Sequence, residues 1–271
     1  MLASLLEFHW LHDPQAWGAL LTLSLLEIVL GIDNIVFISI LVDRLPEEKR
    51  KQGRLLGLGL AMLARFALLL SINWIMGLQK PIWEFSIHPT LWDMMPSAAE
   101  HQGKLGVSWK DLILILGGGF LIYKSTKEIH GKIEGHEDIP GGGSGRSAFG
   151  AILLQIVIVD IVFSLDSVIT AVGMVNDPTK VSLMMVAVVI SIAVMMLASG
   201  AIGAFVSKHP SIKMLALSFL ILIGTALVAE GMHFHFPKGY IYFSMAFSLA
   251  VELLNLKLRS KAKRVSSGDL G

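Results

Sequence analysis

The chain has 271 residues, of which 54% are apolar and only 16% charged, and its mean hydropathy is +0.68. Soluble globular chains are about a quarter charged, so this composition argues against a nucleic-acid binder, a disordered protein and an ordinary soluble enzyme. A net charge of +1 points to no polyanionic partner, and the absence of cysteine excludes disulfides, thiolate ligands and a thiol nucleophile. The composition therefore predicts a polytopic protein of the lipid bilayer.

Seven apolar stretches are each long enough to cross about 30 Å of hydrocarbon as a helix. In chain order they are residues 17–42, 53–78, 110–127, 149–174, 181–206, 213–231 and 239–257. The third is the weakest, because its apolar part is short and contains Gly117, Gly118 and Gly119. We therefore predict an all-α polytopic membrane protein with seven transmembrane helices.

Lysine and arginine lie mainly on one side of these predicted spans. If the N-terminus is outside, 16 of them fall on the inner side and 5 on the outer side. Cytoplasmic loops of membrane proteins carry an excess of basic residues, so the chain is predicted to be N-out and C-in. We expect residues 1–258 to form one transmembrane domain and residues 259–271 to form a basic cytoplasmic tail.

The first and fourth predicted spans contain similar segments, SLLEIVLGIDNIVF and VIVDIVFSLDSVIT. The matched polar pairs are Glu27 with Asp160, Asp33 with Asp166, and Asn34 with Ser167. Each copy would hold three spans, an odd number, so the copies must be inserted in opposite orientations, as in the inverted repeats of secondary transporters. We expect the first repeat over about residues 17–127, the second over about 149–231, and an extra helix over about 239–257.

The four matched carboxylates lie near the middle of their spans. There a charged side chain costs about 2.5–3.5 kcal/mol, whereas a hydrogen bond between helices returns only about 0.6 kcal/mol. Protonated acids that merely hold helices together therefore explain the pattern less well than a site for a cation or a proton does.

Helical geometry leaves two arrangements open for a single site. On a straight helix Asn34 lies within about 20° of Glu27, but Asp33 lies about 120° away. One site thus needs either a local break of the helices at Gly31 and Ser164, or ligands that the two helices share. We expect the break, since interrupted helices are common at the ion sites of transporters.

The predicted metal ligands are Glu27, Asp33, Asn34, Asp160, Asp166 and Ser167. Their hard oxygen donors suit Mn²⁺, Ca²⁺ or Mg²⁺ better than Cu⁺ or Zn²⁺, and metal release could be coupled to proton uptake by the same oxygens. The supporting residues are Arg65, Ser164, Glu128 and Glu230. Arg65 is the only basic residue at midplane depth, and we expect it to pair with a buried acid rather than to act directly in transport.

We expect His233 and His235, at an outer end, to lie at the interface without binding metal.

Four runs of residues resemble the TerC family of integral membrane proteins, and in particular the branch that consists of the membrane domain alone. The runs are LLEIVLGIDNIVF, DIVFSLDSVITA, GGGFLIYKSTKEIH and FSLAVELLNL, and the resemblance covers about residues 15–258. It implies a bundle of the LysE-superfamily type, with two inverted three-helix units plus one helix. It also implies export of Mn²⁺, or of Ca²⁺, from the cytoplasm. The family's acidic helices correspond to Glu27, Asp33 and Asn34, and to Asp160, Asp166 and Ser167.

The leading hypothesis is a divalent-cation exporter of the bacterial inner membrane, which works by alternating access, with protons as counter-ions, and is not an enzyme. The second is a non-transporting membrane partner that supports metalation of exported proteins or resistance to tellurium and metal stress. A homodimer and a translocon-associated partner both remain open, whereas nucleic acid is not expected to bind. An intramembrane hydrolase is disfavoured, because the spans contain neither a GxGD arrangement nor a His/Ser nucleophile pair.

Overall fold

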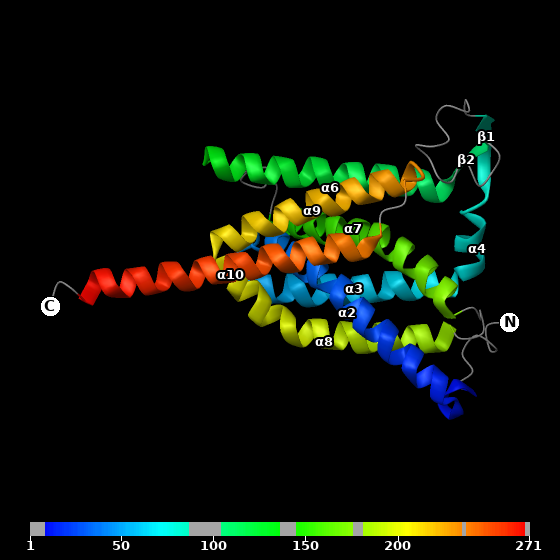
Figure 1. Cartoon of the computed structure of the whole chain (residues 1–271), viewed down its shortest axis with the longest axis horizontal. Helices are drawn as coiled ribbons and strands as arrows, with labels where there is room; N and C mark the ends of the chain where they lie inside the picture. Colours follow the sequence, from blue (N-terminus) through cyan, green and yellow to red (C-terminus); the bar gives the residue numbers. More distant parts are fainter. Residues whose placement is uncertain (1–8, 87–103, 136–144, 176–180, 235–236, 269–271) are drawn as a thin grey trace.

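The computed structural model describes residues 9–86, 104–135, 145–175, 181–234 and 237–268 (Figure 1). Most of them form long helices that run along the long axis of the molecule. The helical elements are η1 (His9–His12), α2 (Pro14–Val42), α3 (Glu47–Leu70), α4 (Ile72–Gly77), α6 (Trp109–Glu134), α7 (Gly145–Val175), α8 (Val181–Lys208), α9 (Pro210–Gly231) and α10 (Lys238–Gly268). Two short strands, β1 (Pro81–Ser86) and β2 (Lys104–Ser108), pair antiparallel at one end.

Local sequence signals mark several helix ends. Asp13 precedes Pro14 at the start of α2, and its side chain accepts a hydrogen bond of 2.9 Å from the backbone N–H of Gln15. At the start of α6, Ser108 and Asp111 form a reciprocal capping box. The same helix ends at Gly135, whose φ of 71° lies in the left-handed region that glycine adopts readily.

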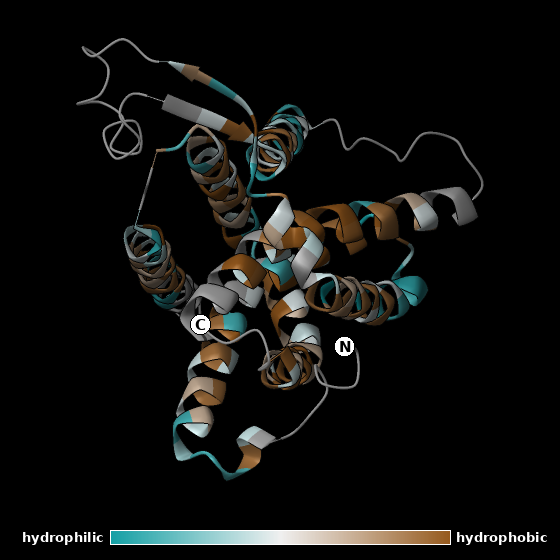
Figure 2. Ribbon diagram, turned by 90° about the vertical axis from the view of Figure 1, so that its right-hand side faces the viewer, coloured by the Kyte–Doolittle hydropathy of each residue, from teal (hydrophilic) through white to brown (hydrophobic). Residues whose placement is uncertain are grey.

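Six of the seven predicted spans coincide with helices long and apolar enough to cross a membrane. These spans lie at Pro14–Val42, Glu47–Leu70, Phe149–Ile169, Val181–Lys208, Pro210–Gly231 and Lys238–Arg259. The remaining one, α6, is a helix of 26 residues whose charged groups lower its hydropathy, in line with its weakness in the sequence. Figure 2 shows that apolar residues dominate the helices when the bundle is viewed from the end that carries β1 and β2, which is called the hairpin end below.

Three details differ from the sequence prediction. The predicted second span is divided, because α3 ends before Ser71 and the short α4 follows it. The chain is not entirely helical, since β1 and β2 pair in the connection before α6. The predicted tail from residue 259 begins as a helix, because α10 continues to Gly268.

The bundle is built from three main helix pairs, in which α2 packs on α8, α3 on α7 and α6 on α9. The backbones of α6 and α9 meet closely at two glycines. A Cβ atom on Gly118 would lie 2.5 Å from the carbonyl oxygen of Gly224, and one on Gly224 would lie 2.8 Å from the carbonyl oxygen of Gly118. Small residues at such a crossing allow helices to approach within van der Waals contact in a membrane.

Two clusters of buried apolar side chains fill the bundle. The tail-end core lies toward the end of the bundle beyond which α10 extends (Figure 1), and it includes Phe37, Leu41, Leu58, Ile156, Val159 and Leu217. The hairpin-end core includes Leu20, Leu23, Leu69, Leu165, Leu183 and Ile192. Along α3 and α7 one core gives way to the other near the middle of the helix, and along α2 it does so between Ile35 and Phe37.

Candidate cation site

Arg65 of α3 lies between two acidic side chains from neighbouring helices. Its Nη1 forms an ion pair with Oε2 of Glu27 on α2, and its Nη2 lies 3.2 Å from Oδ1 of Asp160 on α7. The three residues are only 3% to 6% exposed. The expectation that Arg65 pairs with a buried acid is confirmed, but the residue pairs with two acids, one from each of the matched sequence segments.

Further polar groups complete the surroundings of the Asp160 carboxylate. The side-chain amide of Asn34 donates a hydrogen bond of 3.3 Å to Oδ1, and the hydroxyl of Ser164 donates one of 3.1 Å to Oδ2. Ser167, although also buried, donates instead to the backbone carbonyl of Ser164, at 3.2 Å. Glu27, Asn34, Arg65, Asp160 and Ser164 are called the central cluster below.

The central cluster contains two carboxylates but one guanidinium, so one negative charge is left over when both acids are ionised. It also has unused hydrogen-bonding capacity. Within the described part of the cluster, Nε of Arg65 is buried without a hydrogen-bond partner, and so is the hydroxyl of Ser24, which lies outside the cluster one turn before Glu27 on α2. Since buried polar groups are normally paired, both are notable in an apolar bundle.

The expected break in the helices is wrong, because α2 and α7 run without interruption through Gly31 and Ser164. The hydroxyl of Ser164 bonds the side chain one turn earlier, which is compatible with a regular helix. A Cβ atom on Gly31 would collide with the side chain of Met195, so this glycine permits the close packing of α2 on α8. The other arrangement, polar groups shared between two helices, is the one observed, since Asn34 reaches across to Asp160.

Not all predicted site residues meet in the central cluster. The backbones of Asp33 and Asp166 belong to α2 and α7, but their side chains lie outside the described part of the structure. Glu128 pairs with Arg44 instead. Glu230 lies 3.3 Å from Nζ of Lys110 and 3.9 Å from Nζ of Lys238, close to the hairpin end. His233 lies there too, with Nε2 3.5 Å from Oδ2 of Asp111, while His235 falls outside the described residues.

The described side chains contain no group of three or more His, Cys, Asp or Glu residues placed to hold a metal ion. In the central cluster, the Arg65 guanidinium occupies the position between the two carboxylates. In the described arrangement the guanidinium of Arg65 is thus the cation that compensates the acids.

A second ionic group, which the sequence did not indicate, lies at the tail end of the bundle. Asp43, just after α2, accepts hydrogen bonds from Nζ of Lys213 at 2.8 Å and from the hydroxyl of Ser207 at 2.8 Å. Nη1 of Arg50 lies 3.9 Å from the same carboxylate. These four residues are called the end cluster. They join the α2–α3 connection, which contains Asp43, to the start of α3, the end of α8 and the start of α9, so these parts lie at the same end of the molecule.

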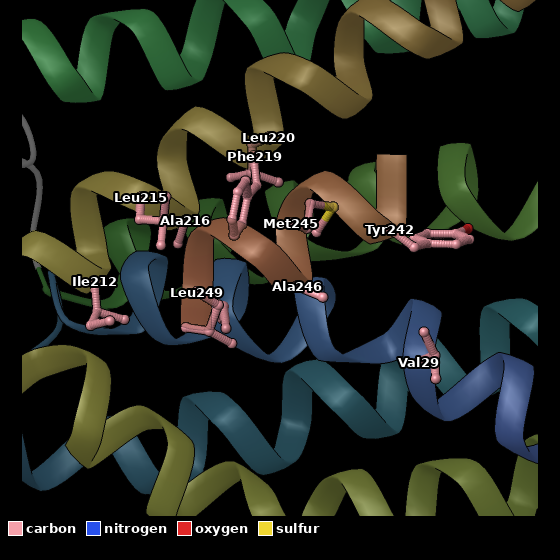
Figure 3. A pocket seen from close by; sticks show the side chains of 11 residues that line it. Val29, Ile212, Leu215, Ala216, Phe219, Leu220, Tyr242, Met245, Ala246 and Leu249 are labelled. Atoms are coloured by element: carbon pink, nitrogen blue, oxygen red, sulfur yellow. The ribbon is translucent and has the colours of Figure 1, made fainter. Parts of the chain in front are cut away.

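A separate apolar groove lies between α9 and α10, with Val29 of α2 at one side (Figure 3). Its volume is about 210 Å³, and Phe219, Tyr242, Met245 and Leu249 are among the residues that line it. No carboxylate is among the described side chains of its lining, so it offers no chemistry for a cation. The central cluster is the better candidate site.

A bundle with six apolar helices of membrane-spanning length, and with an ionic centre buried among them, defines a polytopic integral membrane protein. The family described as integral membrane protein TerC family matches residues 12–267. The chain therefore belongs to the TerC family, and the resemblance seen in its sequence motifs is confirmed.

Several relatives are similar over nearly the whole chain. A UPF0053 protein of Haemophilus influenzae is 48% identical over 256 residues, which cover 94% of this chain and 100% of that protein. The UPF0053 inner membrane protein YgdQ of Escherichia coli is 52% identical over 254 residues, or 94% and 98% of the two chains. The UPF0053 inner membrane protein YoaE of Escherichia coli is 48% identical over 246 residues, which cover 91% of this chain and 44% of that protein. No solved structure matches the chain.

The cellular location follows from the family, the relatives and the helices together. Two of these relatives are named inner membrane proteins, and the described part of the chain has six helices suited to cross a bilayer. The expected location in the inner membrane is confirmed.

Proposed function

We propose that the protein exports a divalent cation, Mn²⁺ in the first place, by alternating access around the central cluster. The observation that carries the proposal is the meeting of Glu27 and Asp160, from the two matched sequence segments, at one buried point. Buried acids in membrane helices mark ion pathways, because their cost is accepted for a function. A carrier of this kind changes no covalent bond and is not an enzyme.

The pairing of helices supports a pseudo-symmetric architecture of two inverted repeats. If the two repeats are equivalent, α2 corresponds to α7, α3 to α8 and α6 to α9. Under this correspondence the contact of α2 with α8 is equivalent to the contact of α7 with α3. The contact of α6 with α9 is equivalent to itself. In this scheme α6 is the seventh span, since its 26 residues are enough to cross about 30 Å of hydrocarbon. The helix α10, which contacts mainly α9, is the additional one. Transporters with inverted repeats bind their substrate at the interface of the repeats.

The position of the central cluster suits a carrier that closes on both sides. The tail-end core and the hairpin-end core adjoin it along α2, α3 and α7, and its members are all buried. A cation could reach it only after one of the two cores has opened. In this proposal the arrangement is a closed state between two open ones. The N-out, C-in orientation is also part of the proposal, and the distribution of lysine and arginine supports it.

The available ligands favour hard cations. Glu27, Asp160 and Asn34 offer carboxylate and amide oxygens, the donors that Mn²⁺ and Ca²⁺ accept. Asp33, Asp166 and Ser167 remain proposed ligands, and protons remain proposed counter-ions, because protons and metal compete for carboxylate oxygens.

The proposal is tested with everted membrane vesicles, in which an exporter accumulates Mn²⁺ in the lumen. We expect Asp33→Asn and Asp166→Asn to abolish accumulation at unchanged protein abundance. Asp43→Asn, in the end cluster, serves as the control and should retain it. Undiminished accumulation by both midplane variants would refute Asp33 and Asp166 as ligands. Absence of Mn²⁺ flux in liposomes that contain the purified wild-type chain, under any gradient, would favour the non-transporting partner instead.

A further inference from the structure

Arg65 is the single basic residue of the central cluster, and it joins the two halves of the bundle. Its guanidinium contacts Glu27 on α2 and Asp160 on α7 at the same time. The oxygens that it contacts belong to the two carboxylates that would hold a transported cation. The guanidinium and a metal ion therefore compete for the same positions, and one must leave when the other binds.

The competition matters most when the carrier is empty. In alternating access, the empty site must pass through the closed state to return to the loading side. Two bare carboxylates between apolar cores would oppose this step, because uncompensated buried charges are strongly unfavourable. A carrier without an internal cation can then return only with a cation or with protons from the other side, which makes it an obligatory exchanger.

No second basic residue is available at this depth in the other half of the bundle. The helix that corresponds to α3 under the exchange of halves is α8, and its only charged residue is Lys208, at its last position. The interior of α8 offers hydroxyl groups such as those of Ser191 and Ser199 instead. The compensation of both acids thus depends on one side chain.

We propose that Arg65 is a tethered counter-cation, which takes the place of the transported ion between Glu27 and Asp160 whenever the carrier is empty. This inference rests on the proposed function and adds a transport mode to it. In the wild-type carrier Arg65 leaves one net negative charge on the empty pair of acids instead of two, so the carrier returns without a transported cation and performs net export. A carrier without the Arg65 charge must instead bring back a divalent cation or protons on these two acids.

The test uses the full chain in proteoliposomes loaded with radioactive Mn²⁺. Net efflux is measured into buffer without divalent cations, and exchange is measured into buffer with unlabelled Mn²⁺. Both are measured at equal, alkaline pH on both sides, so that return of the empty carrier with protonated acids is disfavoured. Wild-type protein should support both. In Arg65→Gln, net efflux should fall by about tenfold or more relative to exchange, because an uncompensated charge at the bilayer centre slows the return by at least that factor.

Two further variants keep the result interpretable. Arg65→Lys keeps the positive charge and should keep a ratio of net efflux to exchange close to that of wild type. Arg54→Gln removes another arginine of α3, which donates to the backbone carbonyl of Ser199 at 2.9 Å, outside the central cluster, and should leave the ratio unchanged.

The possible outcomes separate the inference from the function on which it rests. A wild-type ratio in Arg65→Gln overturns the inference and leaves the exporter intact. If Arg65→Gln has no flux in either mode, Arg65→Lys decides: a wild-type ratio supports the role of the charge, and loss of both fluxes overturns it. Absence of all flux in the wild-type chain refutes the proposed function, and the inference with it.

Discussion

The central cluster and the end cluster use the same kinds of side chain in opposite proportions. At the centre, the one guanidinium of Arg65 serves the two carboxylates of Glu27 and Asp160. At the tail end, the one carboxylate of Asp43 is served by two cations, Lys213 and Arg50. The excess of negative charge therefore lies where water is excluded, and the excess of positive charge lies at the end of the bundle.

This difference separates a group that could bind a cation from one that holds the fold. A cluster at the end of a bundle is accessible to water and ions, so its charges need no close balance. The Asp43 side chain is 15% exposed, and its partners lie near the ends of α3, α8 and α9. The surplus negative charge of a buried cluster does not stabilise the fold. The proposed function explains it, because a mobile cation would bind there.

The largest expected difference is in transport. Asp160→Asn removes a charged ligand and should reduce Mn²⁺ flux by about 100-fold or more, since even outer-shell partners of a metal ligand contribute 10–100-fold. Asp43→Asn removes a carboxylate of similar chemistry from the end cluster and should leave the flux within about twofold of wild type, because only a partly exposed ion pair is lost. Initial rates of flux in proteoliposomes compare the two. Equal losses would break the distinction between the clusters.

A second difference is expected in stability. Arg65→Met leaves two buried acids without compensation and should destabilise the fold by about 3–5 kcal/mol. Lys213→Met leaves Asp43 with Arg50 and Ser207 and should cost about 1 kcal/mol or less. Thermal unfolding in detergent at matched lipid content measures both changes. A larger effect of Lys213→Met would show that the end cluster, and not the centre, holds the bundle together.

The smallest effect concerns salt. Asp43→Asn should lower the unfolding temperature at 50 mM NaCl and have almost no effect at 1 M NaCl, because the Debye length falls to about 3 Å at the higher concentration. The destabilisation by Arg65→Met should persist at both concentrations, since buried pairs are screened little. Salt dependence of the same size in both variants would contradict the assigned burial of the two clusters.

The sequence predicted the helices well and the side-chain pairing only in part. Hydropathy over about 20 residues is a local property, and six predicted spans correspond to apolar helices of sufficient length. The depth of Glu27, Arg65 and Asp160 followed from their positions along these spans. Which of them meet depends on the rotation and packing of three helices, and this is not encoded in any one segment.

Two errors have the same physical origin. A helix break at Gly31 is expected from the sequence because Asp33 points about 120° away from Glu27 on a straight helix, but the missing side chain of Gly31 instead makes room for Met195. The end cluster was missed because Asp43 and Lys213 are far apart in sequence and each is ordinary in its own connection. In both cases the decisive partner lies on another helix.

The most direct test of the central claim is the position of bound Mn²⁺ in crystals of the full chain, determined by anomalous scattering. The account predicts a peak between α2 and α7, coordinated by Asp160 or Glu27, with Arg65 displaced from at least one of these carboxylates. Anomalous peaks confined to the ends of the bundle, with Arg65 still joined to both acids at saturating Mn²⁺, would contradict it.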